Sequence, residues 1–453
     1  MTNGATNPDR LTTGRWTISD RLANAHPAAF SLYCIVAAFG TYFCMYAFRK
    51  PFTAATYEGD AWLGIGFKTI LVAAQVTGYT LSKFIGIKMI SEMPARRRAV
   101  SLLGLIAIAE TALLMFALTP APWNFIWLFI NGLPLGMVFG LVLGFLEGRR
   151  VTEALSAGLC ASFIVSSGVM KSVGRSLMLH FDVNPFWMPF LTGLIFVAPL
   201  LVCVWLLAQI PPPSAEDERL RTRREPMNRD ARRQFFRRHA IGLTGLVAIY
   251  VLLTVIRSIR DDFAVEVWRQ LGVRDQPDVF ATSEFCVMLL VICISGMTFL
   301  IRSNRTGFLS SIWLLSVGFA IVIAAVLGQQ QGSLAPMPYM VLLGLGLYIP
   351  YVAFHTTVFE RMLAAFRETG TIGYLMYLAD AAGYLGYIAV MVLGSFVSDR
   401  LDFLRLLNTV SLVVAVASSV IAVGLGVHFS RTVPRPESNA ALQSLPDTPA
   451  ANA

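Results

Sequence analysis

The chain has 453 residues, of which 56% are hydrophobic and only 14% charged, and its formal net charge is +9. Soluble domains are about 45 to 50% apolar and about 25% charged, so this composition excludes an ordinary water-soluble protein. At about 20 apolar residues for each membrane-spanning helix, the apolar content is sufficient for about twelve spans.

Apolar segments of spanning length recur along the whole chain. Because lipid requires each backbone polar group to be satisfied within its own segment, these segments are predicted to be helices. They lie at about 28–48, 63–87, 99–119, 123–146, 155–179, 187–209, 240–259, 280–301, 308–327, 338–359, 371–396 and 405–428. We therefore predict an all-α integral membrane protein with twelve transmembrane helices in two six-helix bundles.

The composition divides the chain into five parts. A short N-terminal segment, 1–27, precedes a first six-helix bundle at 28–209, and a second bundle occupies 240–428. The linker between them, 210–239, starts near three consecutive prolines and contains nine arginines, so we expect it to be partly helical and to lie on the anionic inner leaflet. The segment 429–453 is predicted to be a disordered cytoplasmic tail.

Basic residues mark one end of the predicted helices. They occur before the first helix and in alternate connections, at Arg96, Arg97, Arg98, Arg149, Arg150, Arg302 and Arg305. By the positive-inside rule this end faces the cytoplasm. The sequence thus predicts a multi-pass protein of the inner (plasma) membrane with both termini in the cytoplasm. This topology accounts for the net charge without a nucleic-acid partner.

Catalytic motifs are absent from the sequence. There is no GxxxxGK[ST], HExxH or GxSxG pattern, and no two cysteines have CxxC spacing. We therefore predict a protein that is not an enzyme and that has no cofactor and no metal site.

Ionisable side chains inside the predicted spans are the most informative residues. Each costs about 2.5 to 3.5 kcal/mol at the centre of a spanning helix and usually has a function. They are Arg49, Lys83, Glu110, Lys171, Arg175, Arg257, Arg260, Glu284, His355 and Asp380. Six of the ten are cationic and three are acidic, so a cavity lined by several of them would suit an anion.

Five of these residues also have an ordinary structural interpretation. Glu110 could pair with a neighbouring base, and Glu284 lies near the outer end of its span, so we expect a structural role for both. Arg49 could extend to the membrane interface, and His355 could be a hydrogen-bonded core histidine. Arg260 could pair with the neighbouring Asp261 and Asp262 in an external cluster.

Glycines recur at every fourth position of the fourth predicted helix. They are Gly132, Gly136, Gly140, Gly144 and Gly148. This spacing places them on one face, where a neighbouring helix can approach closely. The face could serve tight packing alone, or helices could slide along it during a conformational change.

Several of these elements resemble a known family. The runs Tyr46-Ala47-Phe48-Arg49-Lys50-Pro51-Phe52 and Gly78-Tyr79-Thr80-Leu81-Ser82-Lys83-Phe84-Ile85-Gly86 resemble helices 1 and 2 of the organophosphate:phosphate antiporters of the major facilitator superfamily. Val255-Ile256-Arg257, with Asp262 and Phe263 downstream, is similar to the helix 7 element of that family. Met170-Lys171-Ser172-Val173-Gly174 falls where the family has His-Asn-Val-Gly.

The resemblance implies roles for individual residues. The two phosphate-holding arginines of the family correspond to Arg49 and Arg257, and its helix 2 lysine corresponds to Lys83. Lys171 replaces the helix 5 histidine, which adds a fixed charge. A comparison of the two halves of the chain instead pairs Arg49 with Arg260, and we favour Arg257 because it lies deeper and has no adjacent acid.

Together these observations predict a monomeric secondary transporter of a small organic anion, such as a phosphate ester exchanged for phosphate. The predicted substrate-binding residues are Arg49, Lys83, Lys171, Arg257, Tyr46 and His355, and the predicted coupling or gating residues are Asp380, Arg260, Glu147 and Glu360. Two alternatives remain open. One is a proton-coupled symporter of a carboxylate or other small solute in which Asp380 or His355 titrates, and the other is a transporter-like sensor that signals through the linker.

Overall fold

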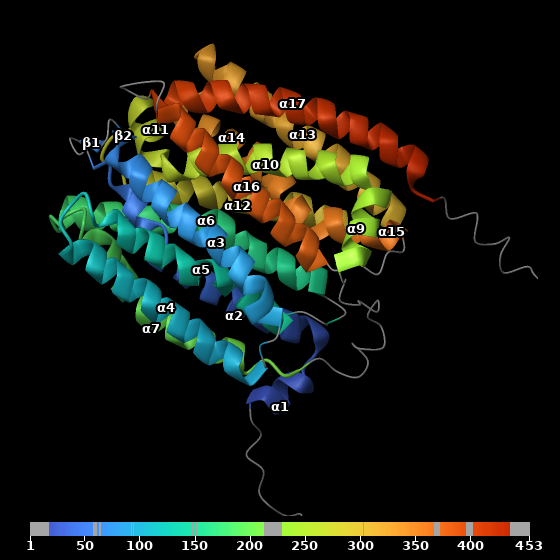
Figure 1. The fold of residues 1–453 in the computed structure, drawn as a ribbon, viewed down its shortest axis with the longest axis horizontal. Helices are drawn as coiled ribbons and strands as arrows, with labels where there is room; N and C mark the ends of the chain where they lie inside the picture. The colour runs from blue at the N-terminus through green and yellow to red at the C-terminus, as the bar shows by residue number, and fades with distance from the viewer. Residues whose placement is uncertain are drawn as a thin grey trace, which may run out of the picture.

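The computed structural model describes residues 18–57, 61–62, 65–91, 93, 95–146, 149, 152–212, 229–301, 303–366, 372–395 and 402–434. Its long helices form two bundles, which Figure 1 shows as a blue-to-green half and a yellow-to-red half. The N-terminal bundle consists of α2 (Pro27–Met45), α3 (Phe67–Ser91), α4 (Ala95–Leu118), α5 (Phe125–Leu146), α6 (Thr152–His180) and α7 (Met188–Ala208).

The C-terminal bundle has the same number of spanning segments. It consists of α10 (Ala240–Asp262), α12 (Asp278–Phe299), α13 (Asn304–Gln330), α14 (Pro336–Ala353), α16 (Ile372–Ser395) and α17 (Phe403–Thr432). The helix α14 continues without a break through the π-helix η3 (Phe354–Val358) into α15 (Phe359–Phe366). These bounds confirm the predicted helices to within a few residues.

Short elements occupy the two ends of the bundles. One end, here called the hairpin end, holds the 3-10 turns η1 (Tyr46–Phe48) and η2 (Pro51–Ala54), the antiparallel strands β1 (Ala61–Trp62) and β2 (Ile65–Gly66), and α11 (Ala264–Gln270). The opposite end, here called the terminal end, holds α1 (Ile18–Ala23), α9 (Arg229–Arg238) and the last turn of α17 (Figure 1). Neither the two strands nor α11 was among the predicted elements.

Two predicted boundaries need comment. The helix α17 continues to Thr432, so the expectation that a disordered tail begins at residue 429 is wrong by four residues. The apolar period simply persists for one more turn, as far as Phe429, which is buried. In the linker, α9 agrees with the expected partial helix, while 213–228 lie outside the described residues.

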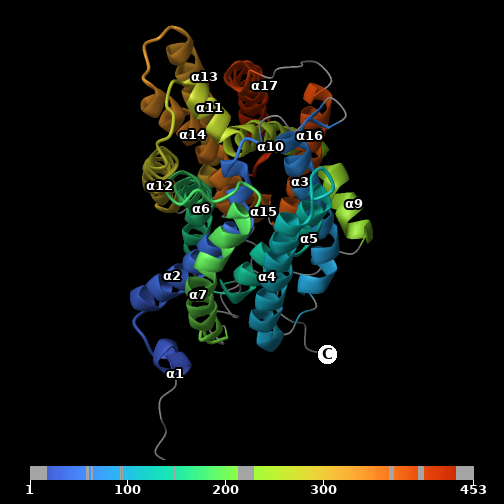
Figure 2. The same ribbon diagram turned by 90° about the vertical axis from the view of Figure 1, so that its left-hand side faces the viewer.

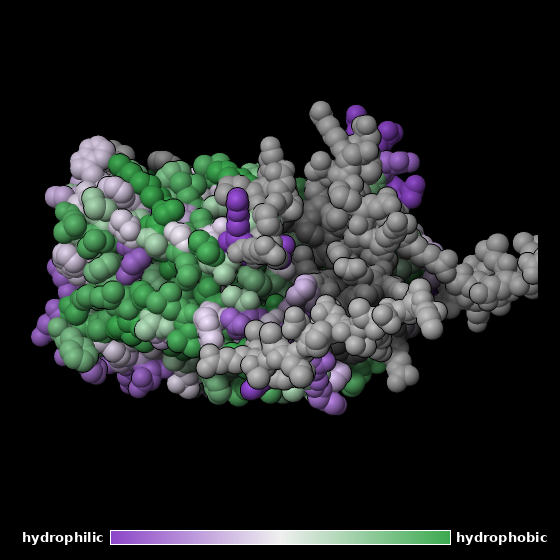
Figure 3. All heavy atoms as spheres, turned by 90° about the horizontal axis from the view of Figure 1, so that it is seen from below, coloured by the Kyte–Doolittle hydropathy of each residue, from purple (hydrophilic) through white to green (hydrophobic). Residues whose placement is uncertain are grey.

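The lengths and composition of the helices suit a membrane. Ten helices in the described part of the chain are long and apolar enough to span one. The two remaining long helices, α3 and α16, lie against each other between the bundles, and the described apolar stretch of α16, Leu378–Val392, is shorter than those of the ten. Their polar side chains therefore contact protein. On the outside, α7 exposes apolar residues such as Leu194, Leu201 and Trp205, and Figure 3 shows a broad apolar area on one side of the molecule.

Helix pairs from opposite bundles hold the two halves together. The helix α6 packs along α12, and α3 packs along α16, with the two bundles arranged side by side (Figure 2).

Within the N-terminal bundle, α3 and α5 approach so closely that a Cβ atom at Gly132 would lie 2.2 Å from the carbonyl oxygen of Gln75. At Gly136 a Cβ atom would lie 2.7 Å from the carbonyl oxygen of Tyr79. This finding supports tight packing as the role of the glycine face.

Candidate functional site

Arg49 lies at the point where the first spanning helix breaks. After Met45 the chain continues as the 3-10 turn η1, and Pro51 begins a second short turn, η2, because proline cannot continue a helix. The Arg49 side chain is only 6% exposed, and its guanidinium carbon lies 3.9 Å from the ring centroid of Tyr79 and 5.7 Å from that of Tyr46. This burial excludes the interpretation that Arg49 extends to the membrane interface.

Two neutral side chains fix the broken helix end beneath Arg49. Gln75 Nε2 donates to the Arg49 carbonyl oxygen at 2.8 Å and to Asn131 Oδ1 at 2.8 Å. Asn131 Nδ2 in turn donates to the carbonyl oxygens of Phe48 and Ala109, each at 3.0 Å. Both amides are buried. Their bonds to the Phe48 and Arg49 carbonyl oxygens satisfy groups that the end of a helix leaves without partners, and thereby hold the Arg49 backbone in place.

Arg257 occupies a comparable position in the C-terminal bundle. It lies on α10, is 7% exposed, and places its guanidinium carbon 4.4 Å from the ring centroid of Tyr351. Among the residues that the structure describes, neither Arg49 nor Arg257 has a carboxylate within ion-pair distance. The Nε atom of each also lacks a hydrogen-bond partner.

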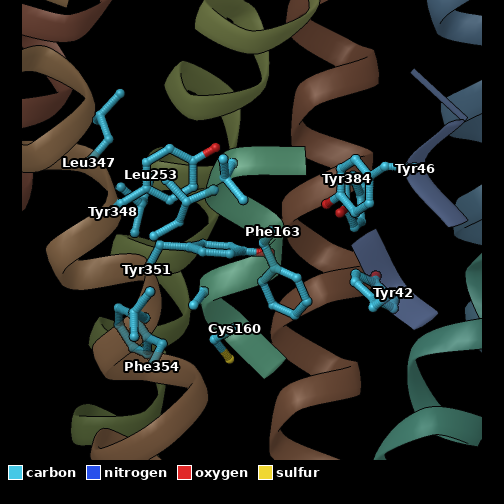
Figure 4. Close-up of a cluster of buried hydrophobic side chains, with 14 of the residues drawn as sticks. Tyr42, Tyr46, Cys160, Phe163, Leu253, Leu347, Tyr348, Tyr351, Phe354 and Tyr384 are labelled. Carbon is cyan, nitrogen blue, oxygen red and sulfur yellow. The ribbon is translucent and has the colours of Figure 1, made fainter. Parts of the chain in front are cut away.

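The two arginines share a set of tyrosines. Tyr46 and Tyr384 each lie near both guanidinium groups. Figure 4 shows Tyr46 and Tyr384 close together, with Tyr351 and Phe163 nearby on other helices. One unpaired arginine from each bundle therefore faces a region lined by aromatic rings and phenol hydroxyl groups.

Lys83 has an acid partner. Its Nζ lies 3.1 Å from Asp380 Oδ2, which joins α3 to α16. The Tyr250 hydroxyl donates to the other carboxylate oxygen of Asp380. His355, in the π-helix η3, contacts the rings of Tyr250 and Tyr351 and has its Nδ1 2.9 Å from the Tyr351 carbonyl oxygen. Lys83, Asp380 and His355 thus belong to one polar group beside the arginines, and their predicted roles remain predictions.

Lys171 belongs to a second polar group, at the hairpin end. Lys171 Nζ forms an ion pair with Asp261 and also donates a hydrogen bond to Ser167 Oγ at 2.9 Å. Lys50 Nζ lies 2.6 Å from Asp261 Oδ2 and 2.5 Å from Asp262 Oδ1. We call Lys50, Lys171, Asp261 and Asp262 the ion-pair layer. Its lysines come from the N-terminal bundle and its aspartates from the C-terminal bundle.

Arg260 does not join its neighbouring aspartates. It pairs instead with Glu284 of α12, at 2.7 Å, and donates to the Met340 carbonyl oxygen at 2.9 Å. The expected pairing with Asp261 and Asp262 is therefore wrong. The physical reason is helical geometry, since consecutive residues on α10 point in different directions. With Arg260 neutralised inside its own bundle, Arg257 is the better counterpart of Arg49.

The charges at the terminal end give less information. Glu147 lies outside the described residues. Glu360, on α15, is partly buried. Two arginines near it form hydrogen bonds within the C-terminal bundle: Arg361 donates to Asn304 Oδ1 at 3.0 Å, and Arg305 donates to the Ser430 carbonyl oxygen at 3.2 Å. The gating roles of Glu147 and Glu360 remain predictions.

Sequence reasoning missed several residues of this site. Gln75 and Asn131 are uncharged, so a search for ionisable residues passed over them. Tyr79, Tyr351 and Tyr384 look like ordinary membrane aromatics in the sequence. A search for amides and phenols that lie inside apolar spans, beside an arginine or lysine, would have found them.

Comparisons with known proteins concern the family and the fold. A model of a family of unknown function (DUF5690) matches residues 51–432. No curated protein matches the chain in sequence. Among solved structures, the crystal structure of a D-xylose-proton symporter aligns with a TM-score of 0.57 and 12% identity, covering 87% of this chain and 97% of the symporter chain. At this identity the likeness concerns the fold alone.

Proposed function

The chain belongs to the DUF5690 family and has a fold of the major facilitator type, and we propose that it is a secondary transporter that binds a small organic anion between its two bundles. One observation carries this proposal. Arg49 and Arg257, one from each bundle, are buried beside shared tyrosines, and no described carboxylate neutralises either of them.

The charge balance favours an anionic ligand. A buried cation without a partner is costly, so such groups in membranes usually face a ligand or a water-filled path. A guanidinium group donates two parallel hydrogen bonds to a carboxylate or phosphate, which explains why arginine rather than lysine suits both positions. Tyr79 and Tyr351 make cation–π contacts with Arg49 and Arg257, which attract the buried charges without neutralising them.

Within this class we propose a phosphate ester exchanged for phosphate. The phenol groups of Tyr46 and Tyr384 can add donors to the oxygens that the two arginines do not contact. The resemblance of helices 1, 2 and 7 to organophosphate:phosphate antiporters supports the same choice. Lys171, however, is paired with Asp261, so it contributes less charge to the ligand than its sequence position implies.

Alternating access requires that the ion-pair layer open. The layer joins the two bundles at the hairpin end through Lys50, Lys171, Asp261 and Asp262, and Lys68 adds a pair with Glu266 at 2.7 Å. Opening a path at this end would separate these partners. An anion held by Arg49 and Arg257 would draw the bundles together near the centre of the membrane, where sites of such repeats lie.

We further propose an orientation. The terminal end carries the arginines of α9 and of the connections between helices, so by the positive-inside rule it faces the cytoplasm and places both termini there. The hairpin end would then face outward, and the protein would act as a monomer in the inner membrane, because one chain supplies both arginines.

Transport in proteoliposomes tests the proposal. Vesicles loaded with phosphate should take up a radiolabelled phosphate ester or dicarboxylate, and Arg49→Gln or Arg257→Gln should each lower uptake at least tenfold. The control is Arg97→Gln, which removes one exposed charge far from the site and should leave uptake unchanged. Unchanged uptake of every accepted anion in both site variants would refute the assignment.

A second function, proton-coupled symport, is favoured by one observation. Asp380 is buried between the bundles and contacts Lys83 and Tyr250, with His355 close by, so a proton could exchange there as the bundles move. Uptake would then follow an imposed pH gradient and lose that dependence in Asp380→Asn. Exchange that persists without any gradient in that variant favours antiport.

A further inference from the structure

A cavity of about 430 Å³ lies at the hairpin end, separate from the site described above. Its walls come from α6, α11 and the segment that joins α11 to the start of α12. Neither Arg49 nor Arg257 lines it, and neither does any member of the ion-pair layer. Ligand cavities in proteins commonly have volumes of about 300 to 1,000 Å³, so this space is large enough for a small organic molecule.

The charged residues of the cavity are mostly basic. Arg175 of α6, Arg269 of α11 and Arg274 line it together with one carboxylate, that of Asp275. Arg175 and Asp275 form an ion pair at 3.0 Å, but the Asp275 side chain is 67% exposed. Because ion pairs with an exposed partner are weak, an incoming anion can replace Asp275 as the partner of Arg175.

The remaining lining is mostly apolar. It consists of the amide of Gln276 and of five apolar or aromatic residues, Val265, Trp268, Val273, Val279 and Phe280. An inorganic ion would leave these surfaces unused. Val273 and Val279 are partly exposed, so the lining fits an anion that also carries a small apolar or aromatic group, with the charge at the arginines and the apolar group against these two valines.

The cavity also touches both bundles. Arg175 belongs to the N-terminal bundle, and the other two arginines belong to the C-terminal one. Close by, the Ala281 N–H donates to Ser172 Oγ at 3.0 Å, and Ser172 Oγ donates to the Pro277 carbonyl oxygen at 2.6 Å, which fixes α6 against the start of α12. A ligand here would contact both halves on the hairpin side of the molecule.

We propose that this cavity is a second anion-binding site, for amphipathic organic anions such as aryl phosphates. The inference does not depend on the proposed transport function, because none of its residues belongs to the Arg49–Arg257 region. The same chemistry is offered by a soluble phosphate ester and by an anionic lipid headgroup.

Calorimetric titration with phenyl phosphate tests the site. The full chain carrying Arg49→Gln and Arg257→Gln serves as the background, so that the proposed central site is silent. We expect saturable binding in this background. Adding Arg269→Gln with Arg274→Gln should weaken it at least tenfold, and so should Val273→Trp, which fills the space and keeps every charge.

The matched control removes two arginines elsewhere. Arg233→Gln with Arg237→Gln changes exposed charges of α9 at the terminal end and should leave the affinity unchanged. The proposal is overturned if the background does not bind phenyl phosphate, or if binding survives both cavity variants.

Lipid composition distinguishes the two sources of the anion. In nanodiscs of phosphatidylcholine, phenyl phosphate should bind with full affinity. Lower affinity in phosphatidylglycerol nanodiscs assigns the cavity to lipid headgroups, and equal affinity assigns it to soluble anions. Both results are consistent with an anion site in the cavity. If the Val273→Trp protein and its background bind phenyl phosphate with equal affinity in both lipids, the proposal is wrong.

Discussion

Lys83 and Asp380 form an ion pair across the two bundles, with Lys83 Nζ 3.1 Å from Asp380 Oδ2. Both side chains are buried, and Tyr250 donates to the second carboxylate oxygen. Breaking a buried pair from one side leaves the other charge uncompensated, which typically costs about 3 to 5 kcal/mol, whereas removing both charges is far less costly.

The first prediction concerns this pair. Asp380→Leu should lower the thermal-unfolding midpoint of the purified protein clearly, and the double variant Lys83→Met with Asp380→Leu should recover most of the loss. A double-mutant cycle on the midpoints, or on denaturant stability, measures the coupling. If the decreases in midpoint caused by Lys83→Met and by Asp380→Leu simply add up in the double variant, the two side chains are not coupled.

The second prediction concerns the ion-pair layer. In a cysteine-free background, Lys50→Cys with Asp262→Cys places two thiols at the contact between the bundles. A short bifunctional thiol reagent should join them and stop transport, and reduction of a cleavable reagent should restore it. The matched control is Arg260→Cys with Glu284→Cys, whose ion pair lies within one bundle. Full transport after cross-linking of the first pair would mean that the hairpin end does not need to open.

The third prediction concerns the amides beneath Arg49. Asn131→Leu removes the donor to the Phe48 and Ala109 carbonyl oxygens and one of the two acceptors of Gln75 Nε2. The Phe48 carbonyl oxygen then has no buried partner, at a cost of about 1 to 3 kcal/mol. We expect weaker anion binding because Arg49 loses its fixed position, with Arg257 unaffected.

Asn124→Leu is the control for this change. Asn124 is also a buried asparagine, but its side-chain atoms have no hydrogen-bond partner in the described part of the chain. It should retain the wild-type affinity. If Asn131→Leu alters stability but leaves the dissociation constant unchanged, Asn131 does not position Arg49.

The fourth prediction concerns helix packing. A side chain at Gly132 would meet the backbone of α3, with a Cβ atom 2.2 Å from the Gln75 carbonyl oxygen, so Gly132→Leu should strongly reduce the yield of folded protein. Gly104→Leu on α4 has nothing within 4 Å of its Cβ position and should be tolerated. Folded yield is measured by size-exclusion chromatography in detergent, and equal yields for the two variants would contradict the close approach of α3 and α5.

The positions of the helices could be predicted from the sequence because apolar segments of spanning length leave no other structure possible in lipid. The segment expected at 240–259, for example, forms α10 over Ala240–Asp262. The partners of the buried charges could not be predicted in this way. Lys83 and Lys171 look like free cations in the sequence, and Asp380 and Asp261 reach them from the other bundle.

The partners of Arg260 and Asn131 could not be predicted for the same reason. The aspartates that follow Arg260 in sequence point elsewhere on the helix, and its partner, Glu284, lies 24 positions further along the chain. Asn131 contacts residues that are 22 and 83 positions away. Such contacts depend on how the helices pack, which the spacing of residues within one helix does not specify.

Ligand binding by purified protein tests the central claim most directly. Thermal shifts should be measured for the wild type, Arg49→Gln and Arg257→Gln against phosphate esters, dicarboxylates and neutral sugars. The account predicts that at least one anion stabilises the wild type saturably, that both variants lose this shift, and that sugars have no effect. Stabilisation by a neutral sugar that is equal in all three proteins, with no response to any anion, would contradict it.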